Sequence, residues 1–118
     1  MNVEQVYSLS LRETDLEGAI KRFCGDEQLY IKCLGAFLED STMEGLIAAV
    51  DSQQWDEAFT AAHALKGVAG NMGFIPLMHA ISRLVVVIRG GRLSEVDETM
   101  TQVISAYRDI TDAIRQNF

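Results

Sequence analysis

The residues best suited to chemistry lie in one helical segment, residues 58–74, which reads AFTAAHALKGVAGNMGF. Apolar residues recur there every three or four positions, a spacing that gathers them on one face of a helix. His63 falls almost opposite that apolar face, because successive residues turn by about 100° around the helix axis. A neutral imidazole can act as a nucleophile through a ring nitrogen without a dedicated base. The segment therefore predicts a helix that presents one nucleophile to solvent.

Two glycines, Gly67 and Gly70, follow His63 by one and two turns and share its side of the helix. A glycine inside a helix costs roughly 1 kcal/mol relative to alanine, so each of them needs an explanation. Close packing in the core explains them poorly, since both point away from the apolar face. Access explains them better, because a side chain at Gly67 would block a large partner from reaching the imidazole. From composition and spacing alone, an idle surface histidine stays an open alternative.

The sequence around His63 resembles the signature of histidine-containing phosphotransfer (HPt) domains. The stretch HALKGVAGNMG is similar to their pattern of a histidine followed by x-Leu-Lys-Gly, a small residue and a glycine near the helix end. The upstream segment RFCGDEQLYIKCLGAFLED (residues 22–40) resembles the one that precedes the histidine helix in this family. Trp55 also stands at the family's usual spacing ahead of His63. The likeness covers roughly residues 15–92.

This resemblance implies that His63 is a phosphoacceptor, which exchanges a phosphoryl group with an aspartate in the receiver domain of a response regulator. Lys66, one turn away, would stabilise the phosphoryl charge, although it could also be an ordinary solvated lysine. The protein would be a phosphocarrier of a two-component phosphorelay with a covalent phosphohistidine intermediate, not an enzyme. Its partners would be a receiver domain and a sensor or hybrid histidine kinase. The residues expected to contact the receiver are Phe59, Gly67, Gly70 and Val86.

Two departures from the family pattern leave the choice of partner open. Val85 stands where the family often has a glutamate, and Asn71-Met72-Gly73 replaces the commoner Leu-Gly ending in a shifted form. Neither change removes the nucleophile. A second hypothesis is a helical docking or inhibitor module that keeps the HPt shape and binds a receiver or kinase domain without being phosphorylated.

No cofactor or metal site is expected in this chain. It has no Gly-rich nucleotide loop ending in Gly-Lys-Ser/Thr, and no acidic cluster beside His63 suited to Mg²⁺. The resemblance places Mg²⁺ in the partner receiver domain only. His79, the other histidine, lacks a similar pattern around it, so we expect a structural or surface role. Cys24 and Cys33 form no Cys-x-x-Cys motif. A disulfide between them is an open alternative, but two buried free thiols are expected.

Composition points to a single globular domain. The chain has 118 residues, 48% of them hydrophobic, and a formal net charge of −7. An acidic surface is a poor partner for the phosphate backbone of nucleic acid. No apolar run approaches the ~20 residues of a membrane span, and the N-terminal residues lack the pattern of a signal peptide. We therefore expect a cytoplasmic, monomeric protein that binds neither nucleic acid nor membrane.

The expected fold is an all-α, up-down-up-down antiparallel four-helix bundle with a short extra N-terminal helix. Residues 1–14 are expected to be a flexible or loosely packed arm, and residues 15–118 the HPt bundle domain. Glycine, proline and capping residues set the expected boundaries. They predict a short helix over about 15–24, one long helix with a possible bend over about 27–50, the histidine helix over about 54–72 capped by Asp51 or Ser52, a helix opening at Ile75-Pro76, and a last helix capped by Ser94.

Overall fold

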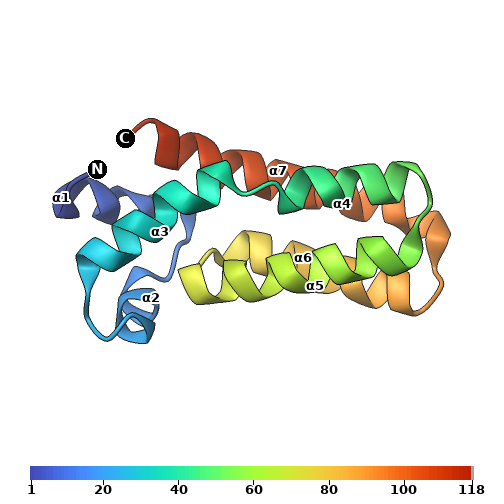
Figure 1. The fold of residues 1–118 in the computed structure, drawn as a ribbon, viewed down its shortest axis with the longest axis horizontal. Helices are drawn as coiled ribbons and strands as arrows, with labels where there is room; N and C mark the ends of the chain where they lie inside the picture. The colour runs from blue at the N-terminus through green and yellow to red at the C-terminus, as the bar shows by residue number, and fades with distance from the viewer. Residues whose placement is uncertain (118) are drawn as a thin grey trace.

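The computed structural model describes residues 1–117, apart from the side chain of Leu11. Its main body is an antiparallel bundle with four helical positions, seen from the side in Figure 1. Three positions are single helices: α5 (Trp55–Met72), α6 (Ile75–Arg89) and α7 (Val96–Arg115). The fourth is shared end to end by α3 (Glu27–Glu39) and α4 (Thr42–Asp51). No strand occurs in the described part of the chain, so the all-α four-helix bundle is confirmed.

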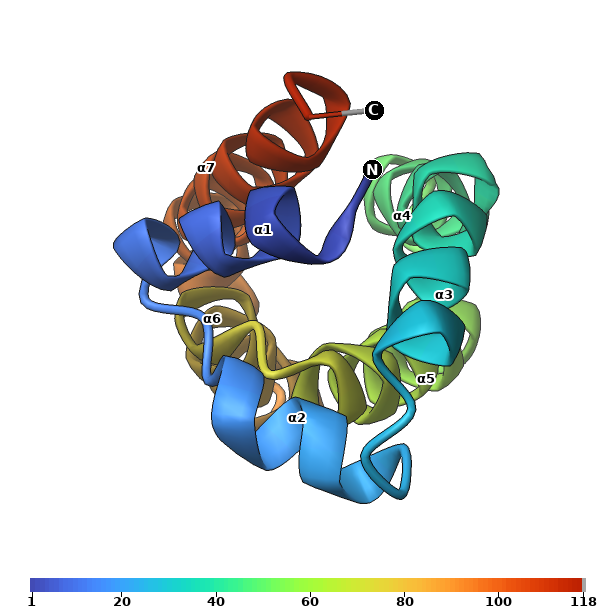
Figure 2. The ribbon, with the colours of Figure 1, turned by 90° about the vertical axis from the view of Figure 1, so that its left-hand side faces the viewer.

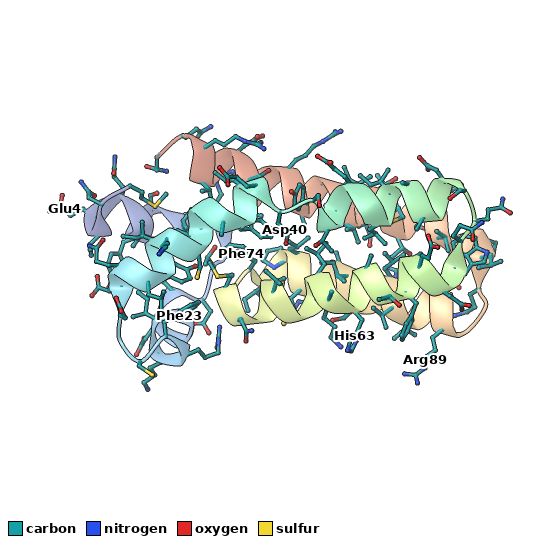
Figure 3. All side chains as sticks on the ribbon, in the orientation of Figure 1. Glu4, Phe23, Asp40, His63, Phe74 and Arg89 are labelled. Atoms are coloured by element: carbon teal, nitrogen blue, oxygen red, sulfur yellow. The ribbon has the colours of Figure 1, made fainter. Side chains whose placement is uncertain are left out.

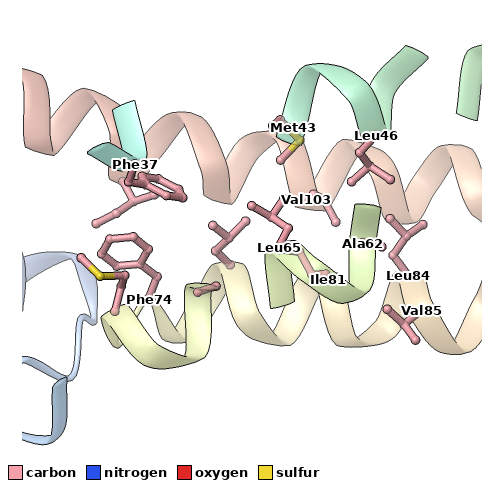
Figure 4. Close-up of a cluster of buried hydrophobic side chains, with 14 of the residues drawn as sticks. Phe37, Met43, Leu46, Ala62, Leu65, Phe74, Ile81, Leu84, Val85 and Val103 are labelled. Atoms are coloured by element: carbon pink, nitrogen blue, oxygen red, sulfur yellow. The ribbon is translucent and has the colours of Figure 1, made fainter. Parts of the chain in front are cut away.

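The hydrophobic core follows the axis of the bundle and fixes the rotation of α5. This helix buries mainly small side chains, with Ala58, Ala62 and Ala69 beside Leu65. Alanines let α5 lie close to α4 and α6, with which it makes its most extensive contacts. Figure 4 shows the buried cluster that α5 completes with side chains from α4, α6 and α7. Because a rotation of α5 would expose this apolar stripe to water, the opposite side of the helix must face solvent.

Residues 1–14, expected to be a flexible or loosely packed arm, instead form two short helical elements, α1 (Val3–Val6) and η1 (Tyr7–Arg12). α1 begins with a capping box, in which the side chains of Asn2 and Gln5 each accept a hydrogen bond from the other's backbone N–H. Val6 and Leu9 are completely buried. Their spacing of three residues places both on one side of such tight turns, which explains why the segment packs on the bundle.

The long helix expected over residues 27–50 is wrong, because the chain breaks between α3 and α4. Asp40 adopts an extended conformation, with φ −71° and ψ 130°. Its carboxylate accepts hydrogen bonds from the backbone N–H of Thr42 at 2.9 Å and from the Thr42 hydroxyl at 2.6 Å. Such local side-chain bonds compete with helical backbone bonds.

The buried residues of α3 end at Phe37 and those of α4 begin at Met43, six positions later. At about 100° per residue, this spacing turns the apolar stripe by about 240°, so a continuous helix could not bury both stripes on one face. This shift in helical phase is the signal that could have predicted the break.

α2 (Leu16–Arg22) lies with α1 across one end of the bundle, as Figure 2 shows. Aspartate side chains cap the first turns of α2 and α3. Asp15 accepts a hydrogen bond from the backbone N–H of Gly18, and Asp26 accepts one from that of Leu29. A side chain that satisfies a free N–H of the first turn stabilises a helix by about 1 kcal/mol. These boundaries were therefore predictable from local chemistry.

The caps expected for α5 and α7 are wrong. Gln54, and neither Asp51 nor Ser52, is the residue that precedes α5, and no side chain caps this helix. A single 3₁₀ turn, η2 (Leu93–Glu95), precedes α7, so Ser94 lies within that turn. Several polar residues stand at each of these helix starts, and the geometry of the connection between packed helices decides where each helix begins.

Both cysteines are free thiols, but the expectation that they are buried is wrong, since Cys24 is exposed and Cys33 is half-buried. Cys24 lies in the turn after α2 with φ 56°, in the left-handed region. That turn carries its side chain out of the bundle. Among the described residues, no helix is both long enough and apolar enough to cross a membrane.

Candidate functional site

His63 lies in the middle of α5, on the side of the helix that faces away from the bundle. Its neighbours Ala62 and Leu65 are buried on the other side and hold this orientation. The imidazole is exposed, and in Figure 3 it projects outward from the helix. This exposure agrees with the position predicted from helical phase. The histidine is thus presented by a rigid helix rather than by a loop.

Phe59 lies one turn before His63 and stacks against it. The two ring centroids are 6.1 Å apart and the ring planes differ by 8°. Phe59 is half-buried, and its side chain packs against the hydrophobic core. A large aromatic ring that is anchored in this way forms a fixed wall on one side of the imidazole. The stack restricts the rotation of the histidine side chain.

Arg89, the last residue of α6, adds a cation next to this pair of rings. Its guanidinium carbon lies 5.7 Å from the centre of the Phe59 ring, within the range of a cation–π contact. In Figure 3, Arg89 and His63 project from the same side of the molecule. Arg89 was not among the residues predicted for this site. Its position one helical turn after Val86, which was predicted to contact the receiver, is the signal that could have found it.

On the C-terminal side of His63, the surface of α5 carries two glycines, Gly67 and Gly70, and so has no side chain at these positions. A β-carbon added at Gly67 would meet no other atom within 4 Å, whereas one at Gly70 would lie 3.5 Å from the Sδ atom of Met78. Gly67 therefore opens directly to solvent, and Gly70 lies half-buried beside α6. Lys66 is half-buried and forms no ion pair with any carboxylate of the described residues. Its ammonium group is available to a bound anion.

The other predicted residues lie on α6. Val86 is 55% exposed, on the outer side of that helix. His79 is also exposed, and it lies in an open groove between α6, α7 and η1 that Arg12 and Asp109 help to line. His79 thus belongs to a different surface from His63. Across the residues described, no three His, Cys, Asp or Glu side chains come together in a way that could hold a metal ion.

The C-terminal end of α5 is held by hydrogen bonds from α2 and α3. Arg22 donates to the backbone carbonyls of Gly70 and Asn71, at 2.8 and 3.1 Å, and the Tyr30 hydroxyl donates to that of Met72 at 2.7 Å. These bonds satisfy carbonyls that a helix leaves open in its last turn. Tyr30 is fully buried, and burial raises the pKa of its hydroxyl well above the usual value of 10.0. These bonds therefore hold the C-terminal end of the helix that carries His63.

The fold and the site together define a class of protein, a helical bundle that presents one exposed histidine between an aromatic wall and an open glycine. The family model of the Hpt domain matches residues 33–117, and the chain belongs to this family. Hpt domains are phosphocarriers of two-component signalling, which interact with receiver domains and kinases and are not classical enzymes. The match includes the second half of α3 and all of α4 to α7, while α1, η1 and α2 precede it. Comparisons with curated proteins and with solved structures gave no significant match.

Proposed function

We propose that this protein carries phosphoryl groups in a two-component phosphorelay, with His63 as the residue that accepts and donates them. The strongest support is the exposed imidazole on α5, inside the part of the chain that matches the Hpt domain. The open surface at Gly67, one turn away, leaves room for a second protein to approach the ring. A rigid helix, an exposed nucleophile and free access are what a relay protein requires.

In the accepting step, one ring nitrogen of His63 attacks the phosphorus of an aspartyl phosphate in a receiver domain. The nitrogen lone pair forms the N–P bond while the P–O bond to the aspartate breaks, and the carboxylate leaves with that electron pair. The other ring nitrogen keeps its proton, so this step needs no separate base. The donating step is the reverse, onto a receiver carboxylate. Phosphoryl transfer gains mainly from positioning and charge stabilisation, so the chain needs little further machinery.

Lys66 is the residue we propose for stabilising the phosphoryl charge from within this chain. A phosphoryl group carries close to two negative charges, and an ammonium one turn away can donate hydrogen bonds to its oxygens. Lys66 has no carboxylate partner among the described residues that would compete for it. The receiver domain is expected to supply the Mg²⁺, and this chain is proposed to bind no cofactor of its own.

The receiver would dock on the surface around His63. Phe59 and Val86 would contribute apolar contacts, and the latter is 55% exposed without a described partner to cover it. Gly67 and Gly70 would let the backbone of α5 come close to the receiver. A sensor or hybrid histidine kinase would stand upstream, and the protein would act as a monomer in the cytoplasm.

Incubation with a receiver domain phosphorylated by its kinase tests this function. Wild-type protein should acquire an acid-labile, base-stable label, and His63→Gln should acquire none. His79→Gln is the matched control, because His79 is the other exposed histidine and lies on a different surface. It should be labelled like wild type. Label on the His63→Gln variant would contradict the proposal, and tight receiver binding without any label on wild type would favour the docking module instead.

A further inference from the structure

The His63 imidazole forms no hydrogen bond or ion pair with any of residues 1–117. Its ring contact is with Phe59, one turn earlier on α5, with centroids 6.1 Å apart and ring planes that differ by 8°. A hydrogen bond to one ring nitrogen is the common way in which a protein orients a functional histidine. In this protein the orientation of the ring rests on the aromatic stack instead.

The parallel stack covers a face of the imidazole and leaves its edge free. The lone pair of an unprotonated ring nitrogen lies in the ring plane and points outward from that edge. Because the two ring planes differ by only 8°, the direction of this lone pair runs beside the Phe59 ring and does not meet it. A T-shaped contact, with the imidazole edge toward the phenyl face, would cover that edge. The observed stack therefore restrains the ring without blocking the atom that attacks phosphorus.

Phe59 is itself held in place by the bundle. It is half-buried and packs against the hydrophobic core, while Ala58 and Ala62, on either side of it along α5, are completely buried. These contacts fix both the rotation of the helix and the position of the phenyl ring. On the other side of His63, the surface at Gly67 is open. The imidazole thus has a fixed wall toward the start of α5 and free space toward its end.

We propose that Phe59 is a positioning residue, which keeps the His63 imidazole in one orientation so that a ring nitrogen can lie in line with the P–O bond that breaks in the receiver. This inference rests on the proposed function and deepens it, because it assigns Phe59 to the rate of transfer as well as to docking. Transfer between two docked proteins requires one orientation of the reacting groups. A helical histidine without a restraint samples about two χ1 wells and about two χ2 orientations, so the productive one is occupied about a quarter of the time.

The exchange of Phe59 for leucine tests this role, because leucine keeps an apolar anchor and removes the ring. The maximal single-turnover rate of transfer from a phosphorylated receiver should fall about twofold to fourfold in Phe59→Leu, and Phe59→Tyr should keep the wild-type rate. A loss of docking alone would raise the receiver concentration at half-maximal rate and leave the maximal rate unchanged, which would overturn the proposal. Tyr7→Leu is the matched control, since Tyr7 is an exposed aromatic residue of η1, outside the site. It should transfer at the wild-type rate.

Two measurements without a partner protein separate the orientation of the ring from its reactivity. Three-bond NMR couplings at His63 should report one dominant χ1 rotamer in wild type and in Phe59→Tyr, and averaging between rotamers in Phe59→Leu. Phosphoramidate phosphorylates an imidazole as its own N–P bond breaks and ammonia leaves with that electron pair. In a His79→Gln background, it should label Phe59→Leu at least as fast as wild type, because a small donor can approach the ring in any orientation.

The outcomes of these measurements decide the role of Phe59. Averaged couplings in wild type, or a single rotamer in Phe59→Leu, would overturn it. Slower phosphoramidate labelling of Phe59→Leu would overturn it as well, because the imidazole itself would then be less reactive. Absence of receiver transfer in wild type, together with the expected couplings, would overturn the relay function and leave the role of Phe59 in orienting His63 standing.

Discussion

Substitution of Gly67 should affect the stability of this protein and its phosphotransfer in opposite directions. It lies in the interior of α5, and a β-carbon added there would meet no atom within 4 Å. Nothing in the fold requires glycine at this position, so Gly67→Ala should stabilise the protein by about 1 kcal/mol through helix propensity alone. For a chain of this size, such a gain raises Tm by about 3–5 °C. Thermal unfolding followed by circular dichroism measures it.

Phosphotransfer should respond in the opposite direction. A side chain at Gly67 stands one turn from His63, on the surface that a receiver must approach. Gly67→Arg should therefore lower kcat/KM for transfer from a phosphorylated receiver by about tenfold to hundredfold, because small displacements of the reacting groups are costly in such reactions. Gly67→Ala, with one methyl group, should show a smaller loss. Both variants should keep the helical circular dichroism spectrum of wild type.

Gly45 provides the matched control for this pair of effects. It is an exposed glycine inside α4, and a β-carbon there would also meet no atom within 4 Å. Gly45→Ala should gain similar stability and transfer phosphate at the wild-type rate. The reasoning would be refuted by destabilisation in Gly67→Ala, by normal transfer in Gly67→Arg, or by an equal loss of transfer in Gly45→Ala.

Three further predictions concern the end of the bundle where α5 finishes. Tyr30→Phe removes the donor to the Met72 carbonyl, so urea unfolding should show a loss of about 1–2 kcal/mol, and an unchanged free energy would mean that the bond contributes nothing. Burial raises the pKa of both Tyr30 and Tyr107. At high pH the folded state therefore keeps protons on these hydroxyls that the unfolded chain has lost. The unfolding free energy should therefore fall as pH rises above about 10, with a shallower fall in Tyr30→Phe; a flat profile in wild type would contradict this linkage. Gly73→Ala should cost about 2 kcal/mol or more, because φ is 78° there and a β-carbon would collide with the Asp15 carbonyl oxygen; wild-type stability in that variant would refute the clash.

The parts of this structure that depend on neighbouring residues were predictable from the sequence. Asp15 and Asp26 cap the helices that follow them, and Gly73 ends α5 in the left-handed conformation that glycine tolerates. The apolar period of α5 was enough to place His63 on the outer side of the helix. Each of these features is decided by contacts within a turn or two, so a linear pattern carries the information.

Features that depend on distant segments were not predictable in this way. The break at Asp40 is a partial exception, because the apolar stripes of α3 and α4 differ in helical phase, while the local hydrogen bonds from Thr42 to the Asp40 carboxylate are seen only in the structure. The N-terminal residues pack because an end of the core remains to be covered, and Val6 and Leu9 cover it. Sequence periodicity does not show which end of the core remains to be covered.

By itself, the sequence determined the helical class of this protein, the family likeness and the residue to test, since amphipathic spacing and the motif around His63 are local properties. Only the tertiary structure brought Arg89 of α6 to the Phe59 ring and joined α2 and α3 to the last carbonyls of α5. The physical reason is that side chains separated by tens of residues meet only where helix packing places them. How a histidine is surrounded, as distinct from whether it is exposed, is a property of the assembled bundle.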